Sequence, residues 1–482
     1  MLDEIFEEFV ASVCYLLRLL LVFDFLLMQL SIKTGFSGSS QSQTAMLKRI
    51  ILLALPVIGS SFMTMAYNFI NMIFVGRLGS DAVAAVGSAS FFMHFAWGVS
   101  ALLTVGTGIK VSHAIGSGNP KLSKDYVRSG ILTLILLSVI YYAMLFVGKS
   151  ELIGLIKLNN PAIEEAAGGF LILVGLAMPF TFQNLFFTSV FIGAGDSKSP
   201  FRINATALAA NILLDYLLIF QAGLGINGAA IGTVISQALG TFLFYRRLRL
   251  FENLNPVGAT FHRSLLREIV GLGVSPTVQR VSFTIVAISL ARIISTWGPT
   301  AIAVQKIGIQ IEAISYMTAG GFLSALATIS GLAYGAGDYR KQGQAFRSGM
   351  LIAIVLGTAT SVLLIVFARP LFSIFLNDQE SLKMGTEYLV ILGYSQLFMV
   401  LELVATGAFF GWGKTNIPAI TGIVLTILRI PMALTFIQLW QNDLASVWWS
   451  ISISSMLKGI LLSVLFIVLF KAFLRKQNMK TT

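Results

Sequence analysis

Long apolar stretches recur along this chain and alternate with short polar loops. A bilayer core requires about 20 apolar residues for each helical crossing, and about twelve stretches of that length are present. They cover residues 50–74, 86–112, 127–147, 166–190, 202–221, 227–246, 268–294, 301–331, 347–367, 386–409, 417–438 and 446–470. The pattern predicts an all-α polytopic membrane protein with twelve transmembrane helices.

The amino-acid composition also indicates a protein that lies in a lipid bilayer. Of the 482 residues, 56% are hydrophobic and 11% are charged, and the mean hydropathy is +0.84. A soluble domain carries about a quarter charged residues, so a water-soluble globular protein is excluded. The single cysteine, Cys14, excludes an internal disulfide and a thiolate metal cluster.

Basic residues gather in alternate loops. The rich loops and the C-terminal tail include Lys121, Lys124, Arg128, Arg246, Arg247, Arg249, Arg340, Lys341, Arg347, Lys471, Arg475 and Lys476. By the positive-inside rule these segments are cytoplasmic, which predicts a multi-pass cell-membrane protein with both termini in the cytoplasm. The net charge of +12 is then explained by topology and by contact with anionic membrane lipids, and we expect no nucleic-acid partner.

Residues 1–45 do not follow this pattern. The first stretch, "MLDEIFEEFVASVCYLLRLLLVFDFLLMQL", begins acidic and is interrupted by Arg18 and Asp24, which predicts an interfacial helix instead of a signal peptide. The segment "GFSGSSQSQ" then has the composition of a flexible linker. A natural translation start at Met28 or Met46 is the alternative, and N-terminal sequencing decides between them.

Two halves of the chain share a plan. "GSGNPKLSKDYVRSG" from Gly116 matches "GAGDYRKQGQAFRSG" from Gly335 at a shift of 219, and "FIGAGDSKSP" from Phe191 matches "FFGWGKTNIP" from Phe409 at a shift of 218. A shift by six helices keeps both halves in one orientation, so these are parallel repeats, which are typical of transporters. The predicted divisions are 46–250, a linker at 251–265, 266–470 and a basic tail at 471–482.

Several of these motifs carry a resemblance. "NMIFVGRLGSDAVAAVG", "FIGAGDSKSPF", "NILLDYLLIFQAGLGINGAAIGTVISQ" and "IEAISYMTAGGFLSALATISGLAYGAGD" resemble the multidrug and toxic compound extrusion (MATE) family, over residues 47–470. The resemblance implies two six-helix repeats around a central cleft. It also implies antiport of a proton or sodium ion against amphipathic, cationic small organic molecules. We expect a monomer without cofactors.

One acid lies inside the fifth predicted helix. Asn211 and Asp215 are spaced i, i+4 and therefore share a helix face; a carboxylate at mid-membrane requires partners. The resemblance implies that these two residues, Thr233 and the position of Asn71 surround the coupling ion. The family commonly has Asp where this chain has Asn71, and Asn68 lies one turn earlier.

The presence of Asn71 in place of an Asp affects which ion we expect to be coupled. Asp215 and Asn211 offer oxygen ligands to sodium, but one negative charge is absent from the set. Burial of a carboxylate away from compensating charge favours its protonated form. We therefore predict coupling to protons in preference to sodium. Interhelical hydrogen bonding is the alternative role for Asn68, Asn71 and Thr233.

The second half has its own polar residues. Glu312 lies deep in the eighth predicted helix and shares a face with Gln305 and Tyr316, which predicts a cleft-lining surface. The resemblance implies that Glu312 is a second coupling acid. Arg280 is the expected counter-ion, and Glu402 on the tenth helix is a further cleft candidate. A structural salt bridge is the alternative for Arg280 and Glu402.

The repeats differ in charge at equivalent positions. At a shift of 218, Asn211 corresponds to Arg429, and Asn184 corresponds to Glu402. Asn184 is included among the cleft candidates for this reason. Buried charge that breaks the symmetry of the frame indicates function.

Two other classes of function are weighed. A flippase for a lipid-linked or anionic substrate is favoured if Arg280, Lys306 and Arg429 face the cleft. An intramembrane enzyme requires a recognisable catalytic set, and the sequence has no HExxH motif or Ser-His dyad at credible spacing. The three histidines also lack metal-ligand spacing. We therefore expect a transporter and not an enzyme.

Overall fold

The computed structural model describes residues 42–156, 158, 160–376, 378–440 and 443–481. The interfacial helix predicted within residues 1–45 falls almost wholly outside the described residues. The described chain is built from helices that are long and apolar enough to cross a membrane, eleven of them single or nearly continuous spans. A twelfth span is a pair of helices bent by 49°, α6 (Pro161–Gly175) and α7 (Met178–Gly193).

The predicted spans correspond to these helices in order. In the N-terminal half the other spans are α2 (Ser42–Gly76), α3 (Ser80–Gly116), α4 (Pro120–Val147), α8 (Lys198–Tyr216) with the π-helix η1 (Leu217–Gln221), and α9 (Gly225–Arg249). In the C-terminal half they are α10 (Arg263–Ile294), α11 (Pro299–Gly335), α12 (Tyr339–Val366), α14 (Gln379–Gly411), α15 (Asn416–Ile427) with α16 (Arg429–Leu439), and α17 (Ala445–Thr481). Short helices α5 (Lys149–Gly154) and α13 (Ala368–Ser373) occupy equivalent loops.

The repeat that is visible in the sequence is also present in the backbone. Glycines with positive φ end or begin helices at equivalent places, where a side chain would be strained. The pairs are Gly79 and Gly298 (φ 104° and 94°), Gly118 and Gly337 (69° and 69°), and Gly195 and Gly413 (88° and 75°). Asn119 caps α4 and its equivalent Asp338 caps α12, each accepting a backbone N–H three residues on. The same sequence signals therefore produce the same turns in both halves.

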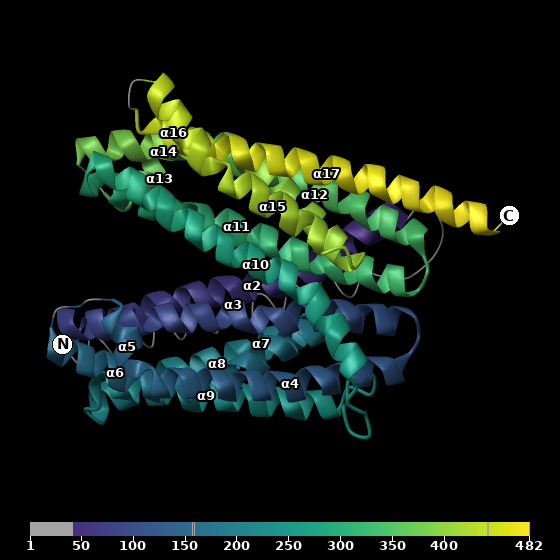
Figure 1. The fold of residues 1–482 in the computed structure, drawn as a ribbon, viewed down its shortest axis with the longest axis horizontal. Coiled ribbons are helices and arrows are strands. Elements are labelled where there is room, and N and C mark those ends of the chain that lie inside the picture. The colour runs from purple at the N-terminus through teal and green to yellow at the C-terminus, as the bar shows by residue number, and fades with distance from the viewer. Residues whose placement is uncertain (1–41, 157, 159, 377, 441–442, 482) are drawn as a thin grey trace.

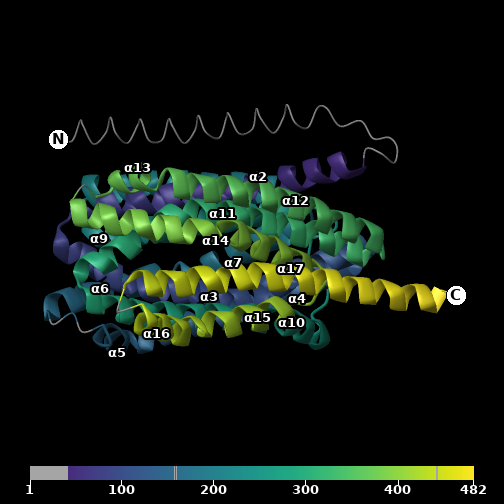
Figure 2. The ribbon, with the colours of Figure 1, turned by 90° about the horizontal axis from the view of Figure 1, so that it is seen from above.

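The helices form two bundles. Figure 1 shows the N-terminal half below and the C-terminal half above, converging toward one end of the molecule and separating toward the other. They converge at the end that carries residues 117–119, 250–262 and 336–338, which we call the basic end. Helix α17 projects past the bundle at this end (Figure 2).

The first helix of each half belongs to both cores. Met46 and Ala54 of α2 pack in the hydrophobic core of the C-terminal half, whereas Phe74 of the same helix packs in the N-terminal core. Helix α10 does the reverse, with Ile269 in the N-terminal core and Leu290 in a C-terminal core. Apolar burial thus ties the halves together near the basic end.

Glycines allow the two halves to approach at backbone distance. A Cβ at Gly273 of α10 would overlap the carbonyl oxygen of Leu102 on α3. At a shift of 219 the same contact recurs, where a Cβ at Gly321 of α11 would meet the carbonyl oxygen of Ala54 on α2. These two seams, α3–α10 and α2–α11, are therefore related by the two-fold symmetry of the repeat.

A second symmetric pair of contacts lies closer to the basic end. A Cβ at Gly116 would overlap the carbonyl oxygen of Leu332, and a Cβ at Gly335 would overlap the carbonyl oxygen of His113. Both pairs join α3 to α11, and the shift of 219 exchanges one for the other. Close packing without side chains holds the halves together here.

We predict that Gly321→Val opens the basic end, because overpacking a close contact costs about 1–3 kcal/mol. The control is Gly320→Val, since a Cβ at Gly320 has no neighbour within 4 Å. Spin labels at Lys121→Cys and Arg340→Cys, two exposed positions in the two halves, report the separation in a Cys14→Ser background. The labels should separate in the Gly321 variant alone; equal distance distributions in both would contradict the seam.

Candidate functional site

Asp215 is buried inside the N-terminal half. Its side chain is 1% exposed and that of Asn211 is 2% exposed, both on α8. The Asn211 amide donates a hydrogen bond to Asp215 Oδ1 at 2.8 Å. Gly232 on α9 has no side chain, and a Cβ there would overlap the same carboxylate oxygen. Among the described residues, no Lys, Arg or His nitrogen lies within 4.0 Å of this carboxylate.

Helix α2 completes this site. The Tyr67 hydroxyl forms a hydrogen bond with Thr233 of α9 and interacts electrostatically with Asp215. Asn71, one turn further along α2, has a buried Oδ1 without a hydrogen-bond partner, whereas Asn68 is exposed. Asp215 and Asn211 are thus in direct contact, and Thr233 is linked to them through Tyr67. Tyr67 was missed, although its i, i+4 spacing to Asn71 was a usable signal.

The backbone changes directly after the acid. Helix α8 ends at Tyr216 and continues as the π-helix Leu217–Gln221. Gln221 donates a side-chain hydrogen bond to the Tyr216 hydroxyl at 3.2 Å. π-Helical turns are rare and are frequent at functional sites, and the hydrophobic pattern gave no sign of this one.

Glu312 of α11 is half-buried, and its Oε1 is buried without a hydrogen-bond partner. The Tyr388 hydroxyl of α14 donates a hydrogen bond to Glu312, and Arg429 of α16 interacts with it electrostatically. Gly308, one turn earlier on α11, leaves room for the Tyr388 ring. Arg280, the expected counter-ion, is exposed. No ion pair between Arg280 and Glu312 is found among the described residues, so its role as counter-ion stays a prediction.

Further charges fill the C-terminal half. Lys458 of α17 forms an ion pair with Glu402 of α14 at 3.3 Å, and their side chains are 7% and 12% exposed. Arg429 donates to the hydroxyls of Ser454 and Ser455, at 2.6 and 3.0 Å. Glu402 therefore lies inside the bundle between α14 and α17, and not on an exposed cleft wall as predicted. Lys458 was missed by the sequence analysis.

The remaining cleft candidates are dispersed. Asn184 lies between α7 and α9, where it donates to Gln237 Oε1 at 2.8 Å and accepts from Thr241 at 2.9 Å. It is 8% exposed, so its predicted place in the cleft is corrected to helix packing. Gln305 has a buried Oε1 without a partner, and Tyr316 is 57% exposed. In the described part of the chain no three His, Cys, Asp or Glu residues are grouped to hold a metal ion.

Comparison with known proteins assigns the chain to a family. The family model described as MatE matches residues 56–217 and 277–435, which is well over half of the chain. This chain belongs to the MatE family. The two matched segments fall one in each half, as the internal repeat requires. The family comprises multidrug efflux transporters, a class without enzymatic activity.

Relatives and solved structures agree with that assignment. The chain is 26% identical over 413 residues to the probable multidrug resistance protein NorM of Thermotoga maritima, covering 83% of this chain and 88% of the relative. It is 26% identical over 423 residues to the probable multidrug resistance protein YoeA of Bacillus subtilis, covering 85% and 90%. A crystal structure of MATE in complex with MaL6 superimposes with a TM-score of 0.83 at 20% identity, covering 91% of this chain and 100% of that one.

An outward-facing structure of a multidrug resistance MATE family transporter gives a TM-score of 0.82 at 20% identity, covering 91% of this chain and 99% of that one. The fold is therefore the MatE arrangement of two six-helix repeats. The predicted all-α, twelve-helix architecture is confirmed.

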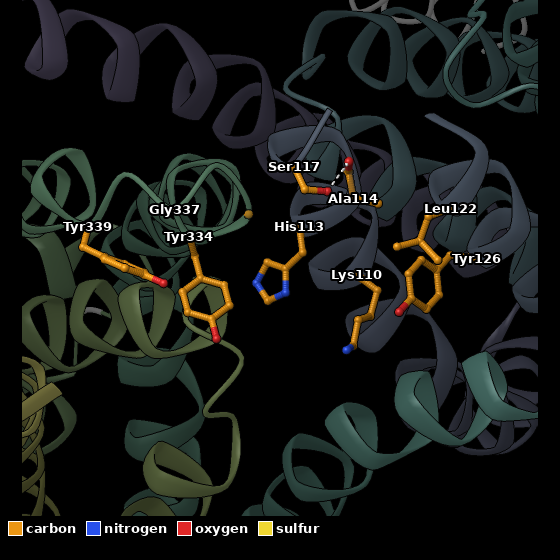
Figure 3. A pocket seen from close by; sticks show the side chains of 10 residues that line it. Lys110, His113, Ala114, Ser117, Leu122, Tyr126, Tyr334, Gly337 and Tyr339 are labelled. Carbon is orange, nitrogen blue, oxygen red and sulfur yellow. Dashed lines mark hydrogen bonds between the residues drawn. The ribbon is translucent and has the colours of Figure 1, made fainter. Parts of the chain in front are cut away.

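This MatE member has a cavity of about 420 Å³ between its halves at the basic end. Figure 3 shows His113 pointing into the space between Tyr334 and Tyr339 on one side and Lys110 and Tyr126 on the other. The residues come from α3 and α4 of one half and from α11 and α12 of the other. The cavity thus lies where the two halves meet.

Polar contacts cross between the halves beside this cavity. Glu268 of α10 accepts from Lys110 at 2.6 Å and from the Tyr126 hydroxyl at 2.7 Å. His113 Nε2 lies 2.7 Å from the carbonyl oxygen of Gly411 on α14. These contacts reinforce the glycine seams and close the basic end in this state of the MatE fold.

We predict that removing one partner of the buried Glu402–Lys458 pair destabilises the protein by about 3–5 kcal/mol, because the other charge stays buried and unpaired. Glu402→Gln and Lys458→Met should each lower the apparent unfolding temperature in detergent, and the double variant should recover most of the loss. The exposed pair Lys341–Asp338, at 2.8 Å, is the control: Lys341→Met should cost at most about 1 kcal/mol. Additive losses in the double variant would contradict a mutual interaction.

Proposed function

We propose that this chain is a cation-coupled antiporter that exports amphipathic, cationic small organic molecules by alternating access. Its membership of a multidrug efflux family supports export of small organic molecules. At the basic end, glycines let the backbones of the two halves touch, and this close packing supports a state that is closed at that end. Two parallel halves that pack against each other can rock without refolding.

The observation that carries the proposal is that the buried Asp215 carboxylate has no described cation beside it. An isolated carboxylate in the membrane interior costs roughly 3 kcal/mol or more, and no described cation lies within 4.0 Å of this one. Among the described side chains, the Asn211 amide donates a hydrogen bond to it, and Tyr67 interacts with it electrostatically. The charge is therefore balanced when a mobile cation or a proton arrives, which is what coupling requires.

The donor set favours a proton over sodium. Sodium prefers several oxygen ligands, yet Asn211 turns its N–H toward Asp215 Oδ1, and Asn71 is an amide without negative charge. Asp215 is the one carboxylate that these contacts bring into the site. A proton requires a single oxygen and leaves the hydrogen bond from Asn211 in place.

The flippase alternative is not favoured by the position of Arg429. It required three basic side chains in the cleft, but Arg429 is 6% exposed and held by two serine hydroxyls. Arg280 and Lys306 are the exposed pair that remains. An anionic substrate would therefore meet fewer cations than the alternative assumed.

We predict that Asp215→Asn abolishes coupling, because an amide cannot exchange a proton or balance a cation. Proteoliposomes should move the fluorescent organic cation ethidium against its gradient when a pH gradient is imposed on the unmodified protein. In the variant an imposed gradient should leave the flux at its gradient-free rate. Glu165→Gln, which removes an exposed acid, is the control. Full gradient-driven flux through the Asp215 variant would overturn the proposal.

We predict that Asn71→Asp adds a response to sodium, because it supplies a second carboxylate beside the Asp215 site. Ethidium flux under an imposed sodium gradient at constant pH measures this response. The unmodified protein should show little acceleration, and the variant should show clear acceleration. Sodium-driven flux of equal size in both proteins would show that the charge at residue 71 does not select the ion.

A further inference from the structure

We propose that Arg280 is the residue with which this transporter recognises an acidic group on a substrate, so that the exported molecules include aromatic carboxylates. Arg280 lies on α10 and extends into the space between the two halves. The inference rests on the proposed export of small organic molecules, and its test therefore includes a binding measurement that needs no transport.

The first support is the depth of Arg280 in the membrane. It lies close to the middle of α10 (Arg263–Ile294), and a helix rises about 1.5 Å per residue, so it is near the centre of the hydrocarbon layer. It is nevertheless exposed. Among the described residues, no carboxylate oxygen lies within 4.0 Å of its guanidinium. A charged side chain at this depth is costly beside lipid and is retained where it faces water or a ligand.

The second support is that the exposed surface of α10 has two different sides. One side is a stripe of large apolar residues at i, i+4 and i+7 spacing, which suits contact with lipid. Its members are Val274, Val278, Val281, Ile285 and Ile288. The other side carries Arg280 and Thr284, both exposed. Gly273 belongs to this second side, because seven residues are close to two helical turns.

Gly273 shows where the second side of α10 points. A Cβ at Gly273 would overlap the carbonyl oxygen of Leu102 on α3, so this side is directed at the N-terminal half. Two turns further from the basic end, Arg280 lies on the same side and is exposed. The halves touch at Gly273 and have separated at Arg280, in agreement with their divergence in Figure 1. Arg280 therefore extends into the space between them.

Aromatic rings of α3 line the opposite wall of this space. Phe95 and Phe91 precede Leu102 by seven and eleven residues and share its helix face. They are 56% and 69% exposed, although the same face meets α10 at Leu102. Since α3 ends at the basic end and α10 begins there, Phe95 comes level with Arg280. The space thus has a cation on one wall and apolar rings on the other.

The repeat indicates that this charge is not part of the shared frame. At a shift of 219, Arg280 corresponds to Ser61 of α2, and Phe95 corresponds to Ile314 of α11. Those two positions lie beyond the other seam, where Ala54 meets Gly321, and neither is charged. Packing of the halves therefore does not require an arginine at this place.

The two walls determine the chemistry of the ligand. A guanidinium presents paired N–H donors that match a carboxylate, and phenyl rings favour a flat apolar body. A carboxylate on an aromatic ring system satisfies both walls at once. A phospholipid headgroup stays at the membrane surface, whereas Arg280 lies near the middle of the bilayer, which favours a small molecule over a lipid.

The test compares three probes that share a naphthalene ring and differ in charge: 2-naphthoate, 2-naphthamide and 2-naphthylmethylammonium. Equilibrium dialysis against purified protein in detergent measures the affinity for each. Arg280→Gln should weaken the binding of naphthoate about tenfold or more, because a hydrogen-bonded charge pair is lost. It should change naphthamide binding little and strengthen binding of the ammonium probe, because a like charge is removed.

Two further variants and a control separate charge from shape. Arg280→Lys retains the charge and loses the paired donors, so its affinity for naphthoate should lie between those of the unmodified protein and Arg280→Gln. Phe95→Ala should weaken the binding of all three probes alike, because the ring contact does not depend on their charge. Arg340→Gln removes an exposed arginine at the basic end and should change none of the three affinities.

Equal affinity for naphthoate in Arg280→Gln and in the unmodified protein would overturn the inference. Equal losses for naphthoate and naphthamide would overturn it too, since they would indicate a change of shape and not of charge. If Arg280→Gln does not fold, Arg280→Lys decides by the same comparison. In nanodiscs, loss of naphthoate binding when the anionic lipid phosphatidylglycerol is added would assign Arg280 to a lipid headgroup and overturn the inference.

Ethidium transport distinguishes this inference from the proposed antiport. Ethidium carries no acidic group, so its flux in proteoliposomes under a pH gradient tests the antiport alone. Absence of that flux in the unmodified protein, together with naphthoate binding that depends on Arg280, would reject cation antiport and leave the acid-binding site in place. Gradient-driven ethidium flux without any dependence of naphthoate binding on Arg280 would do the reverse.

Discussion

A charge inside a membrane must be balanced nearby, and this constraint determines where the ionisable residues of the chain lie. Glu402 is balanced by Lys458, a cation from a neighbouring helix. Asp215 is 1% exposed and accepts a hydrogen bond from the Asn211 amide. The C-terminal half therefore balances a buried acid with a fixed cation, whereas no described cation lies within 4.0 Å of Asp215 in the N-terminal half.

The seams between the halves follow the symmetry more closely than the charges do. Ser112 and Gly331 touch each other, and the shift of 219 exchanges them, so their contact lies on the two-fold axis. Lys110 and Glu268 join α3 to α10, but the residue equivalent to Lys110 is Ile329. Backbone packing is shared by both seams, whereas the ion pair belongs to one of them. The two seams thus have equivalent backbone packing, but the Lys110–Glu268 ion pair belongs to the α3–α10 seam.

The sequence was sufficient for the spans and the repeat, because both depend on local signals. Apolar length defines a crossing, and Gly118 and Gly337 require positive φ at the same turn. Neighbours across helices were harder to predict. Periodicity shows which residues share a face, but it does not show which helix that face meets. Arg280 was therefore chosen as the partner of Glu312, while Arg429 and Lys458 were not connected to any acid.

The candidate ion site and the seam are joined by one helix. Ala54 of α2 packs against Gly321 in the other half, and three to four turns later Tyr67 of the same helix contacts Thr233 and Asp215. Helix α2 also contributes to both hydrophobic cores. The seam and the acid are therefore joined by one helix, which contains Pro56 between Ala54 and Tyr67. The helix that contributes to both hydrophobic cores therefore also contributes Tyr67 to the surroundings of Asp215.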